Sequence, residues 1–224
     1  MGQALSLPGH GALASFWSER TFGRIVLAYD KRLHQLLSIA ARTFAERGYH
    51  ATSMRDLARA SGFSLAGIYH YVGSKLELLF LIQDRCFVQV IAGARDAVAQ
   101  AEEPEARLAA FIHHHVIFFT AHMDEMKVLS HESDELEGTM RAQLRRRKRD
   151  YANLLLELLD DVPGAQISRQ TAAFALFGMI NWIYTWYHPT GPLRPDRLGE
   201  EMSRLFLSGY AAPVAHSTTR LVAP

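Results

Sequence analysis

The sequence has a single cysteine, Cys86, and this scarcity excludes an intrachain disulfide. It also has little net charge, with a formal value of +1, so any surface that binds nucleic acid must be a local patch. Its first segment, MGQALSLPGHGALASFWSER, lacks the basic start and continuous apolar core of a secretory signal. These absences predict a protein of the reducing cytoplasm.

Long hydrophobic runs are scarce as well. Residues 170–193 carry no Asp, Glu, Lys or Arg, and by length this stretch can cross a bilayer. Such a span would bury Asn181, Thr185 and His188 in lipid, and Pro189 would interrupt it. We therefore expect no membrane span here but a helix that other helices cover.

Motifs that indicate an enzyme are missing too: there is no Gly-x-Ser-x-Gly, no P-loop and no dinucleotide-binding fingerprint. His113, His114 and His115 suggest a metal site at first sight, but successive helix residues point about 100° apart and cannot share one ion. His122 is too far along the chain to join His115. Cys86 has no obvious base and is interpreted as a packing residue. We expect no catalysis, no metal and no cofactor.

Apolar residues recur with helical periodicity along most of the chain, and few segments alternate with period two, so we predict an all-α protein. Gly48 should end the first helix, and Ser53 (with Asp56), Ser64 and Ser74 should begin the next three. The helices are expected at residues 30–47, 53–61, 64–71, from 74 onward, 105–122, 134–159, 168–187 and 196–209.

From this order of helices we predict an N-terminal three-helix domain with a helix-turn-helix, joined by a long helix to a C-terminal helical bundle. We expect the bundle to bind a ligand and to dimerise. The expected boundaries are a flexible arm (1–28), the DNA-binding domain (29–77), the ligand-binding and dimerisation domain (78–210) and a flexible tail (211–224).

A helix, a turn around Gly62 and a short second helix are typical of a helix-turn-helix. Such a motif places its second helix in the major groove and binds phosphates at helix N-termini. Residues 29–77 contain seven Lys/Arg against four acidic residues, an excess of positive charge where DNA would bind. The alternative is a three-helix packing module whose Tyr and His side chains cover a hydrophobic corner.

The stretch FAERGYHATSMRDLARASGFSLAGIYHYVGSKLELL resembles the DNA-binding domain of the TetR family of bacterial transcriptional repressors. The matching framework positions are Phe44, Gly48, Thr52, Ser53, Leu57, Ala58, Gly62, Ser64, Tyr69, His70, Ser74 and Lys75. By this resemblance Thr52, Tyr69, His70 and Lys75 hold phosphates, while Arg55 and the helix from Ser64 face base edges. The predicted DNA-binding residues are Thr52, Ser53, Arg55, Ser64, Leu65, Ala66, Gly67, Tyr69, His70, Tyr71 and Lys75.

The sequence departs from the family pattern at Leu65, Ala66 and Gly67, where the family often has Lys, Gly and Thr. Leu65 and Ala66 cannot form hydrogen bonds with a base but can contact a thymine methyl group. We therefore expect T-rich positions in each half-site.

The segment 168–187 is apolar on nearly every side, so it must be covered on every side. Packing against its counterpart in a second copy, together with the helix at 196–209, would cover it. The family resemblance implies the same homodimer. The alternative is a monomer with a central buried helix.

Six of the nine residues from Arg141 to Arg149 are basic. They form either a solvated face paired with acids elsewhere or a clamp for the phosphates of a coenzyme A thioester. The segment INWIYTWYHPTGPL is similar to TetR-family members that respond to acyl-CoA, which favours the clamp. The predicted ligand-binding residues are Phe111, His115, Phe118, Phe119, Arg141, Arg145, Arg149, Trp182 and Trp186. For each aromatic side chain the alternative, which its residue type favours, is a role in the core alone.

We predict a homodimeric repressor that a small effector releases from double-stranded operator DNA, the effector being a CoA thioester of a fatty or aromatic acid. The first alternative is an efflux-type regulator that senses a free hydrophobic or cationic compound. The second, from another class, is a helical scaffold without DNA binding.

Overall fold

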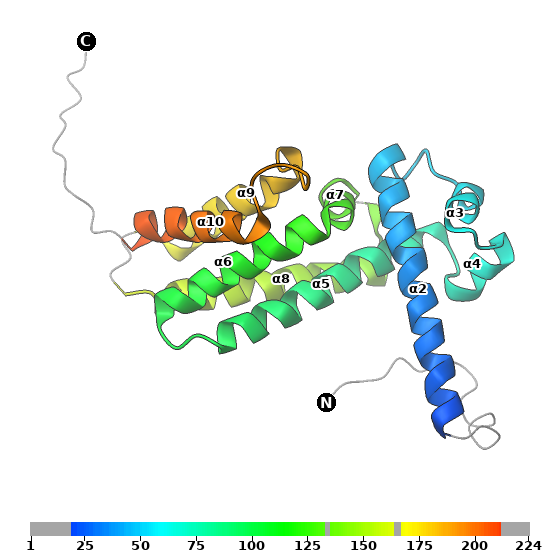
Figure 1. Cartoon of the computed structure of the whole chain (residues 1–224), viewed down its shortest axis with the longest axis horizontal. Helices are drawn as coiled ribbons and strands as arrows, with labels where there is room; N and C mark the ends of the chain where they lie inside the picture. The colour runs from blue at the N-terminus through cyan, green and yellow to red at the C-terminus, as the bar shows by residue number, and fades with distance from the viewer. Residues whose placement is uncertain (1–18, 133–134, 164–166, 212–224) are drawn as a thin grey trace, which may run out of the picture.

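The computed structural model describes residues 19–132, 135–163 and 167–211, with side chains from residue 29 onward. Throughout these ranges the regular secondary structure is helical, without strands, and the predicted all-α class is confirmed (Figure 1). Most of the predicted arm and tail lies outside the described residues. The remainder of the arm differs from the prediction, because residues 19–28 are helical.

The N-terminal unit consists of α2 (Glu19–Arg47), α3 (Met54–Ser61) and α4 (Leu65–Tyr71). Helix α2 begins eleven residues before the predicted start at Asp30, because the preceding segment contains no proline and its backbone continues the helix. It ends where predicted: Gly48 has φ of 84°, a left-handed conformation that glycine adopts without a Cβ penalty. Its N–H donates to the carbonyl of Phe44 at 2.8 Å.

The predicted N-caps are confirmed at three helices. The Ser53 hydroxyl accepts from the N–H of Asp56 at 3.2 Å, and the Asp56 carboxylate accepts from the N–H of Ser53 at 2.9 Å, which completes a capping box. The Ser64 hydroxyl accepts from the N–H of Gly67, and that of Ser74 from the N–H of Glu77. The boundaries of this part of the fold therefore follow from local chemistry.

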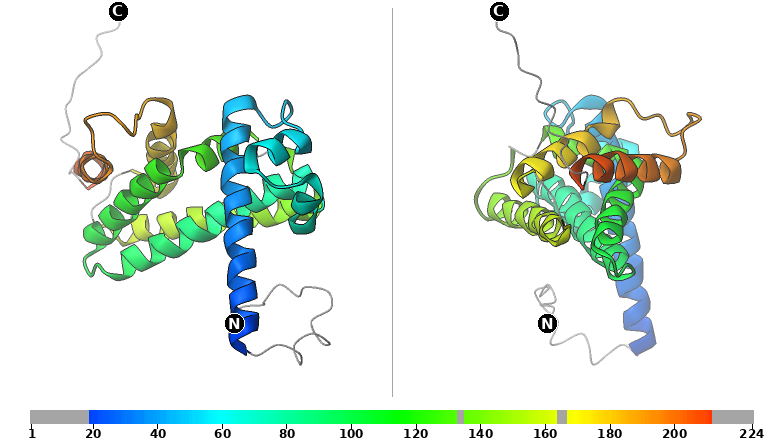
Figure 2. Two further views of the ribbon diagram at one scale, coloured as in Figure 1. Left: turned by 45° about the vertical axis from the view of Figure 1, so that its right-hand side comes forward. Right: turned by 90° about the vertical axis from the view of Figure 1, so that its left-hand side faces the viewer.

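Helix α5 (Lys75–Ala99) leaves the N-terminal unit and runs into the C-terminal domain (Figure 1). There it packs beside α6 (Pro104–Ala121) and α8 (Gly138–Asp161). Helix α9 (Arg169–Asn181), the 3-10 helix η2 (Trp182–Thr185) and α10 (Pro195–Tyr210) cover the side of the domain opposite α5 (Figure 2). The core continues from Phe44 in the N-terminal unit to Leu176 in α9.

Three helices of the C-terminal domain differ from the prediction. Helix α7 (Met123–His131) was not expected, since its short apolar pattern carries few of the usual helix signals. The helix expected from residue 134 begins at Gly138. The one expected over 168–187 ends at Asn181 and tightens into η2, a frequent ending for an α-helix.

None of the helices in the described part of the chain is long and apolar enough to cross a membrane. This agrees with the prediction for residues 170–193, whose helical part is interrupted after Asn181.

Candidate DNA-binding and effector sites

Helices α3 and α4 form a helix-turn-helix at one end of the molecule (Figure 1). Gly62 ends α3 with φ of 71°, and its N–H donates to the carbonyl of Ala58. Ser64 then begins α4. The buried side chains of Leu57 in α3 and Ile68 in α4 hold both helices against the core. The opposite side of α4 is left facing solvent.

More than half of the predicted DNA-binding residues are exposed to solvent on α3, α4 or the N-caps of these helices. Six are exposed, and Leu65 and Gly67 are half-buried. Tyr69 retains 49% of its surface, so its hydroxyl is available to a partner. The exposed residues are Ser53, Arg55, Ser64, Ala66, Tyr69 and His70. The exposed part of the predicted set thus lies on the helix-turn-helix, and its contacts with DNA stay predictions.

Thr52 and Lys75 have structural contacts that the sequence did not reveal. Thr52 is 1% exposed, and its hydroxyl donates to the carbonyl of Gly48 at 2.8 Å. The Lys75 ammonium donates to the carbonyls of Tyr49 and Thr52, both at 2.9 Å, and lies 4.2 Å from the centre of the Tyr49 ring. Both side chains therefore build the loop between α2 and α3, and their phosphate contacts stay predictions.

Tyr71 also has packing contacts that the sequence did not reveal. It lies three residues after the buried Ile68, on the core side of α4. Its ring centre is 4.8 Å from that of Tyr29 and 5.9 Å from that of Phe63. The half-buried side chain packs between α2 and the turn, and its DNA contact stays a prediction.

The C-terminal domain contains a cavity of about 500 Å³ between α5, α6, α7, α8 and α9. Most of its lining is apolar, and the polar groups are few, as in sites for small organic ligands. We call it the effector cavity. Its lining residues are Cys86, Phe87, Val90, His115, Phe119, Met126, Leu129, Ser130, Lys148, Tyr151, Ala152, Phe174, Phe177 and Asn181.

A buried pair of polar side chains lies in the wall of the effector cavity. His115 is 1% exposed, and its Nδ1 lies 2.8 Å from the hydroxyl of Tyr151. Burial lowers the pKa of His115 to about 3, so the ring is neutral at physiological pH. Burial also raises the pKa of the Tyr151 hydroxyl. The ring of His115 stacks on that of Phe119, with 4.0 Å between the centres.

Only part of the predicted ligand-binding set lines this cavity: His115 and Phe119 do. Phe111 lies behind them, with its ring centre 5.1 Å from that of Tyr151. Phe118 stacks on His122 instead. Trp182 and Trp186 are outside the lining, 61% and 42% exposed, because the chain tightens into η2 and turns them outward.

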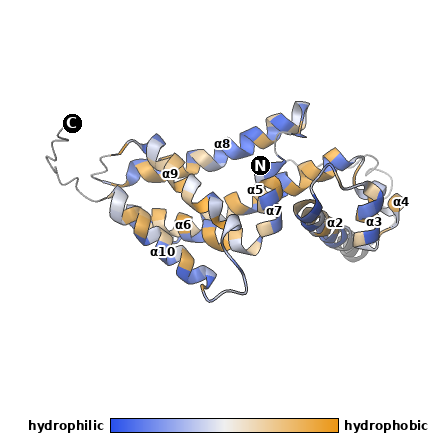
Figure 3. Ribbon diagram, turned by 90° about the horizontal axis from the view of Figure 1, so that it is seen from above, coloured by the Kyte–Doolittle hydropathy of each residue, from blue (hydrophilic) through white to orange (hydrophobic). Residues whose placement is uncertain are grey.

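The basic run also differs in detail from the prediction. Lys148 lines the cavity, while Arg145 and Arg149 are exposed nearby on α8, a largely hydrophilic helix (Figure 3). The Arg141 guanidinium donates to the carbonyl of Leu136. Arg147 forms an ion pair with Asp84 of α5 at 2.9 Å.

Sequence reasoning missed Lys148, Tyr151 and Asn181. Lys148 belongs to the basic run that the sequence shows. Tyr151 lies three residues after Lys148, so helical spacing places it on the same side of the helix. No comparable signal pointed to Asn181, which reaches the cavity from the end of α9.

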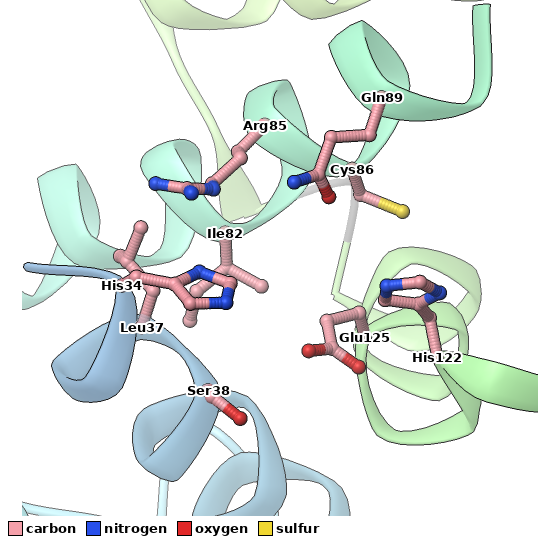
Figure 4. Close-up of a pocket in the computed structure, with 9 residues that line it drawn as sticks. All are labelled: His34, Leu37, Ser38, Ile82, Arg85, Cys86, Gln89, His122 and Glu125. Carbon is pink, nitrogen blue, oxygen red and sulfur yellow. The ribbon is translucent and has the colours of Figure 1, made fainter. Parts of the chain in front are cut away.

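A second, smaller cavity of about 30 Å³ lies where the two domains meet, between α2, α5 and the α6–α7 junction (Figure 4). Polar side chains from all three sides point into it, among them His34, Arg85 and Glu125. Cys86 lines this cavity and the effector cavity alike. Burial raises the pKa of its thiol far above the ordinary value, so Cys86 is an inert packing residue in the wall between them.

The domains also meet through the loop between α2 and α3. The N–H of Tyr49 donates to the carboxylate of Glu132 at 3.3 Å, and His50 Nε2 lies 3.0 Å from a carboxylate oxygen of Glu135. One ligand atom from each of His50, Glu132 and Glu135 lies within 4.8 Å of the others, so these three residues are the ones that can hold a metal ion within the described ranges. The His50–Glu135 contact and the Tyr49–Glu132 hydrogen bond already account for the positions of these side chains.

A helix-turn-helix on a small unit, linked by α5 to a helical domain with an apolar cavity, defines a DNA-binding regulator with its own effector domain. Residues 36–82 match the family of bacterial regulatory proteins called tetR, and residues 101–210 match the tetracyclin repressor-like C-terminal domain. The chain belongs to the TetR family and is a transcriptional regulator of that type.

Individual relatives agree with this membership. The HTH-type transcriptional repressor KstR2 of Mycobacterium tuberculosis is 25% identical over 83% of this chain and 96% of its own length. The activator FasR of Mycolicibacterium smegmatis is 35% identical over 38% of this chain and 39% of its own. A structure of AibR in complex with isovaleryl coenzyme A and operator DNA is 30% identical, covers 78% of this chain and 97% of AibR, and has a TM-score of 0.70.

Proposed function

We propose that this protein is a homodimeric repressor that leaves its operator when a small acyl compound, a CoA thioester of a fatty or aromatic acid, enters the effector cavity. The observation that carries this proposal is the apolar cavity with Lys148 at its wall and more basic residues beside it on α8. Binding to operator DNA would place its action in the cytoplasm.

The lining of the cavity favours an acyl group over a cationic drug. Pockets for organic cations use aromatic rings together with nearby carboxylates. The described lining contains aromatic rings but neither Asp nor Glu, and its charged residue is the cation Lys148. An uncharged apolar body that carries a negative group at one end fits this chemistry better than the free cation of an efflux-type regulator.

The basic residues of α8 suit the phosphates of coenzyme A. Arg141, Arg145 and Lys148 follow one another at spacings of four and three residues, so they share one side of the helix. At 1.5 Å per residue this row extends about 10 Å along α8 from the cavity wall. Guanidinium groups bind phosphates through two hydrogen bonds at once. The structure of AibR with isovaleryl coenzyme A and operator DNA supports the same ligand class here.

The exposed apolar side chains of the C-terminal domain support a homodimer. Phe174 is 79% exposed, Trp182 61% and Leu205 67%. They lie on α9, η2 and α10, which cover one side of the domain (Figure 2). An apolar surface of this kind marks a protein contact. A second copy on this side also provides the second recognition helix that half-sites one turn apart require.

Helix α7 offers a route from the cavity to the DNA-binding unit. Met126, Leu129 and Ser130 line the cavity, and the residues after α7 contact Tyr49 and His50. An effector that moves α7 therefore alters contacts of the loop that precedes α3. We infer that effector and operator binding oppose each other through this element.

A mobility-shift assay tests the proposed function. A DNA fragment from upstream of this protein's own gene is bound first, and straight-chain, branched and aromatic acyl-CoAs are then added, with free CoA as the control. We expect at least one acyl-CoA to release the DNA while free CoA does not. Retention of the DNA complex with every thioester would reject the CoA proposal, and failure to bind any promoter fragment would reject the repressor itself.

A further inference from the structure

We propose that His115, held in place by Tyr151, donates a hydrogen bond from Nε2 to a carbonyl oxygen of the effector, so that the effector cavity selects compounds with a carbonyl group on an apolar body. The inference rests on the proposed role of this cavity as the effector site. It does not depend on coenzyme A.

The two ring nitrogens of His115 have different surroundings. Nδ1 lies 2.8 Å from the Tyr151 hydroxyl. Nε2 is buried and has no hydrogen-bond partner of normal geometry among the described residues. Since His115 lines the cavity and is 1% exposed, a partner for Nε2 must come from the cavity, either a ligand or the nearby side chain of Asn181.

The hydrogen bond between Tyr151 and His115 determines whether the partner of Nε2 is a donor or an acceptor. Tyr151 is almost fully buried, and its hydroxyl contacts His115 Nδ1. If this hydroxyl donates to Nδ1, its own proton is satisfied and Nε2 must carry the hydrogen of the neutral ring. The opposite tautomer would leave the Tyr151 proton without an acceptor in this buried place. Nε2 therefore presents an N–H to the cavity and requires an acceptor.

Because the His115 ring is neutral, the acceptor that binds its Nε2 N–H is expected to be an uncharged group. Burial keeps His115 neutral, so the ring cannot neutralise a carboxylate. An anionic part of the ligand would lie at Lys148, which reaches the same cavity from α8. A ketone or thioester carbonyl accepts one hydrogen bond from the ring and adds no charge to the buried wall.

Asn181 does not already fill this role. Its side chain lies near the imidazole and favours the protonated ring, but it forms no hydrogen bond of normal geometry with Nε2. It is an exposed residue at the end of α9, so its amide can rotate away when a ligand enters. A ligand carbonyl can take its place beside the N–H.

Simple packing is an insufficient account of His115. Its ring stacks on Phe119 and lies beside Tyr151, contacts that a phenylalanine would also make. A buried N–H without an acceptor destabilises the fold, because it loses its hydrogen bonds to water and forms none with the protein. We therefore infer that Nε2 of His115, a polar atom at the cavity wall, binds a group of the ligand.

Two ligand pairs test the proposal, each differing by one carbonyl. The first pair is isovaleryl-CoA and S-isopentyl-CoA, in which a CH₂ replaces the thioester C=O. The second is acetophenone and ethylbenzene, which contain no CoA. Calorimetry or quenching of tryptophan fluorescence measures affinity, and we expect the full-length protein to prefer the carbonyl member of at least one pair by on the order of tenfold.

The variants H115L and H115Q separate hydrogen bonding from packing. H115L has no donor, so the preference should disappear through weaker binding of the carbonyl member. H115Q keeps an N–H near the position of Nε2 and should retain part of the preference. Unchanged operator binding and melting behaviour show that each variant is folded.

The outcomes distinguish this proposal from the function proposed above. Preference for acetophenone without binding of either CoA compound would overturn the CoA proposal and uphold the role of His115. Equal affinity for the two members of every pair that binds would overturn the role of His115 and leave the effector site intact. Failure of all four compounds to bind would overturn both.

Discussion

Single residues of this protein show how burial changes the role of a side chain. His113, His114 and His115 are adjacent, yet each meets a different environment. The ring of His113 lies against Gly199 of α10 and that of His114 against Gly93 of α5, where an added Cβ would come within 2.6 Å and 2.4 Å of the respective ring. His115 faces the effector cavity. The helical rotation of 100° per residue separates them, as the sequence predicted.

The neutral state of His115 should make stability depend on pH. Its folded pKa is about 3 and the ordinary value is 6.5, so the unfolded chain binds a proton that the folded protein excludes. The resulting stability is complete above pH 6.5 and is lost as the pH falls toward 3. Between pH 7 and pH 5 the free energy of unfolding should fall by about 2 kcal/mol more in the parent than in H115Q.

Urea unfolding at the two pH values measures this difference, at one protein concentration because a dimer's stability depends on it. H114Q is a useful comparison, since desolvation also lowers the pKa of His114 but this side chain is less deeply buried. Equal losses of stability in the parent and H115Q would show that His115 is not held neutral.

Tyr69 offers a cleaner test of DNA binding than Lys75. Y69A removes a half-exposed side chain from α4, so melting behaviour should be unchanged while operator affinity falls about tenfold, the value of a hydrogen bond to a charged group. Fluorescence anisotropy with a labelled operator measures the affinity. V88A, which truncates an exposed side chain of α5, is the control and should leave DNA binding unaltered. K75A would also remove two loop hydrogen bonds, so its effect would combine folding and binding.

At the scale of the elements, α8 has two sides with different tasks. Tyr151 and Leu155 face the interior, while Arg145 and Arg149 remain exposed beside the cavity. The double variant R145A/R149A should raise the acyl-CoA concentration that releases DNA on the order of tenfold, since it removes two phosphate-binding groups. Affinity for the operator should stay the same, because α8 belongs to the other domain.

Titration of DNA release with acyl-CoA measures this effect, and R95A/R194A, which removes exposed arginines from α5 and from the N-cap of α10, is the matched control. The difference between the parent and R145A/R149A should shrink at high salt, because exposed charges are screened. An identical response of the parent and the double variant would assign these arginines to a solvated face.

Helix α7 lines the effector cavity, and the residues after it contact the loop between α2 and α3. In E135Q the carboxylate that pairs with His50 loses its charge, while the cavity-lining residues of α7 are untouched. We expect the effector to bind E135Q as tightly as the parent but to release less DNA at saturation. E137Q, at the N-cap of α8, serves as the control. Full release in E135Q would show that coupling takes another route, such as α5.

At the scale of the whole molecule, the exposed apolar side of α9, η2 and α10 should decide the oligomeric state. W182E/L205E places charges on this surface and should turn a dimer into a monomer with an intact fold, with loss of operator binding because two recognition helices must act together. Analytical ultracentrifugation gives the mass, and V88E tests an exposed apolar position elsewhere. A dimeric W182E/L205E would place the interface on another surface.

The arrangement of the domains also explains which predictions failed. The three N-terminal helices and their caps depend on residues close in sequence, such as Ser53 with Asp56, and these were predictable. The packing contacts of Tyr71 and Lys75 were not predictable, because their partners, Tyr29 and Tyr49, lie more than twenty residues away. The same holds for Trp182, whose direction depends on where α9 tightens into η2.

The sequence by itself determined the helical class, the helix-turn-helix and the family, because periodicity, caps and a glycine turn act over a few residues. It also located the basic run of α8 and the apolar segment of α9. Only the tertiary structure decided that Lys148, Tyr151 and Asn181 meet at one cavity and that His115 lines it, with no regular hydrogen bond to Nε2 from the described residues. Five helices contribute to that wall, and their relative positions follow from the packing of the entire domain, which no local pattern encodes.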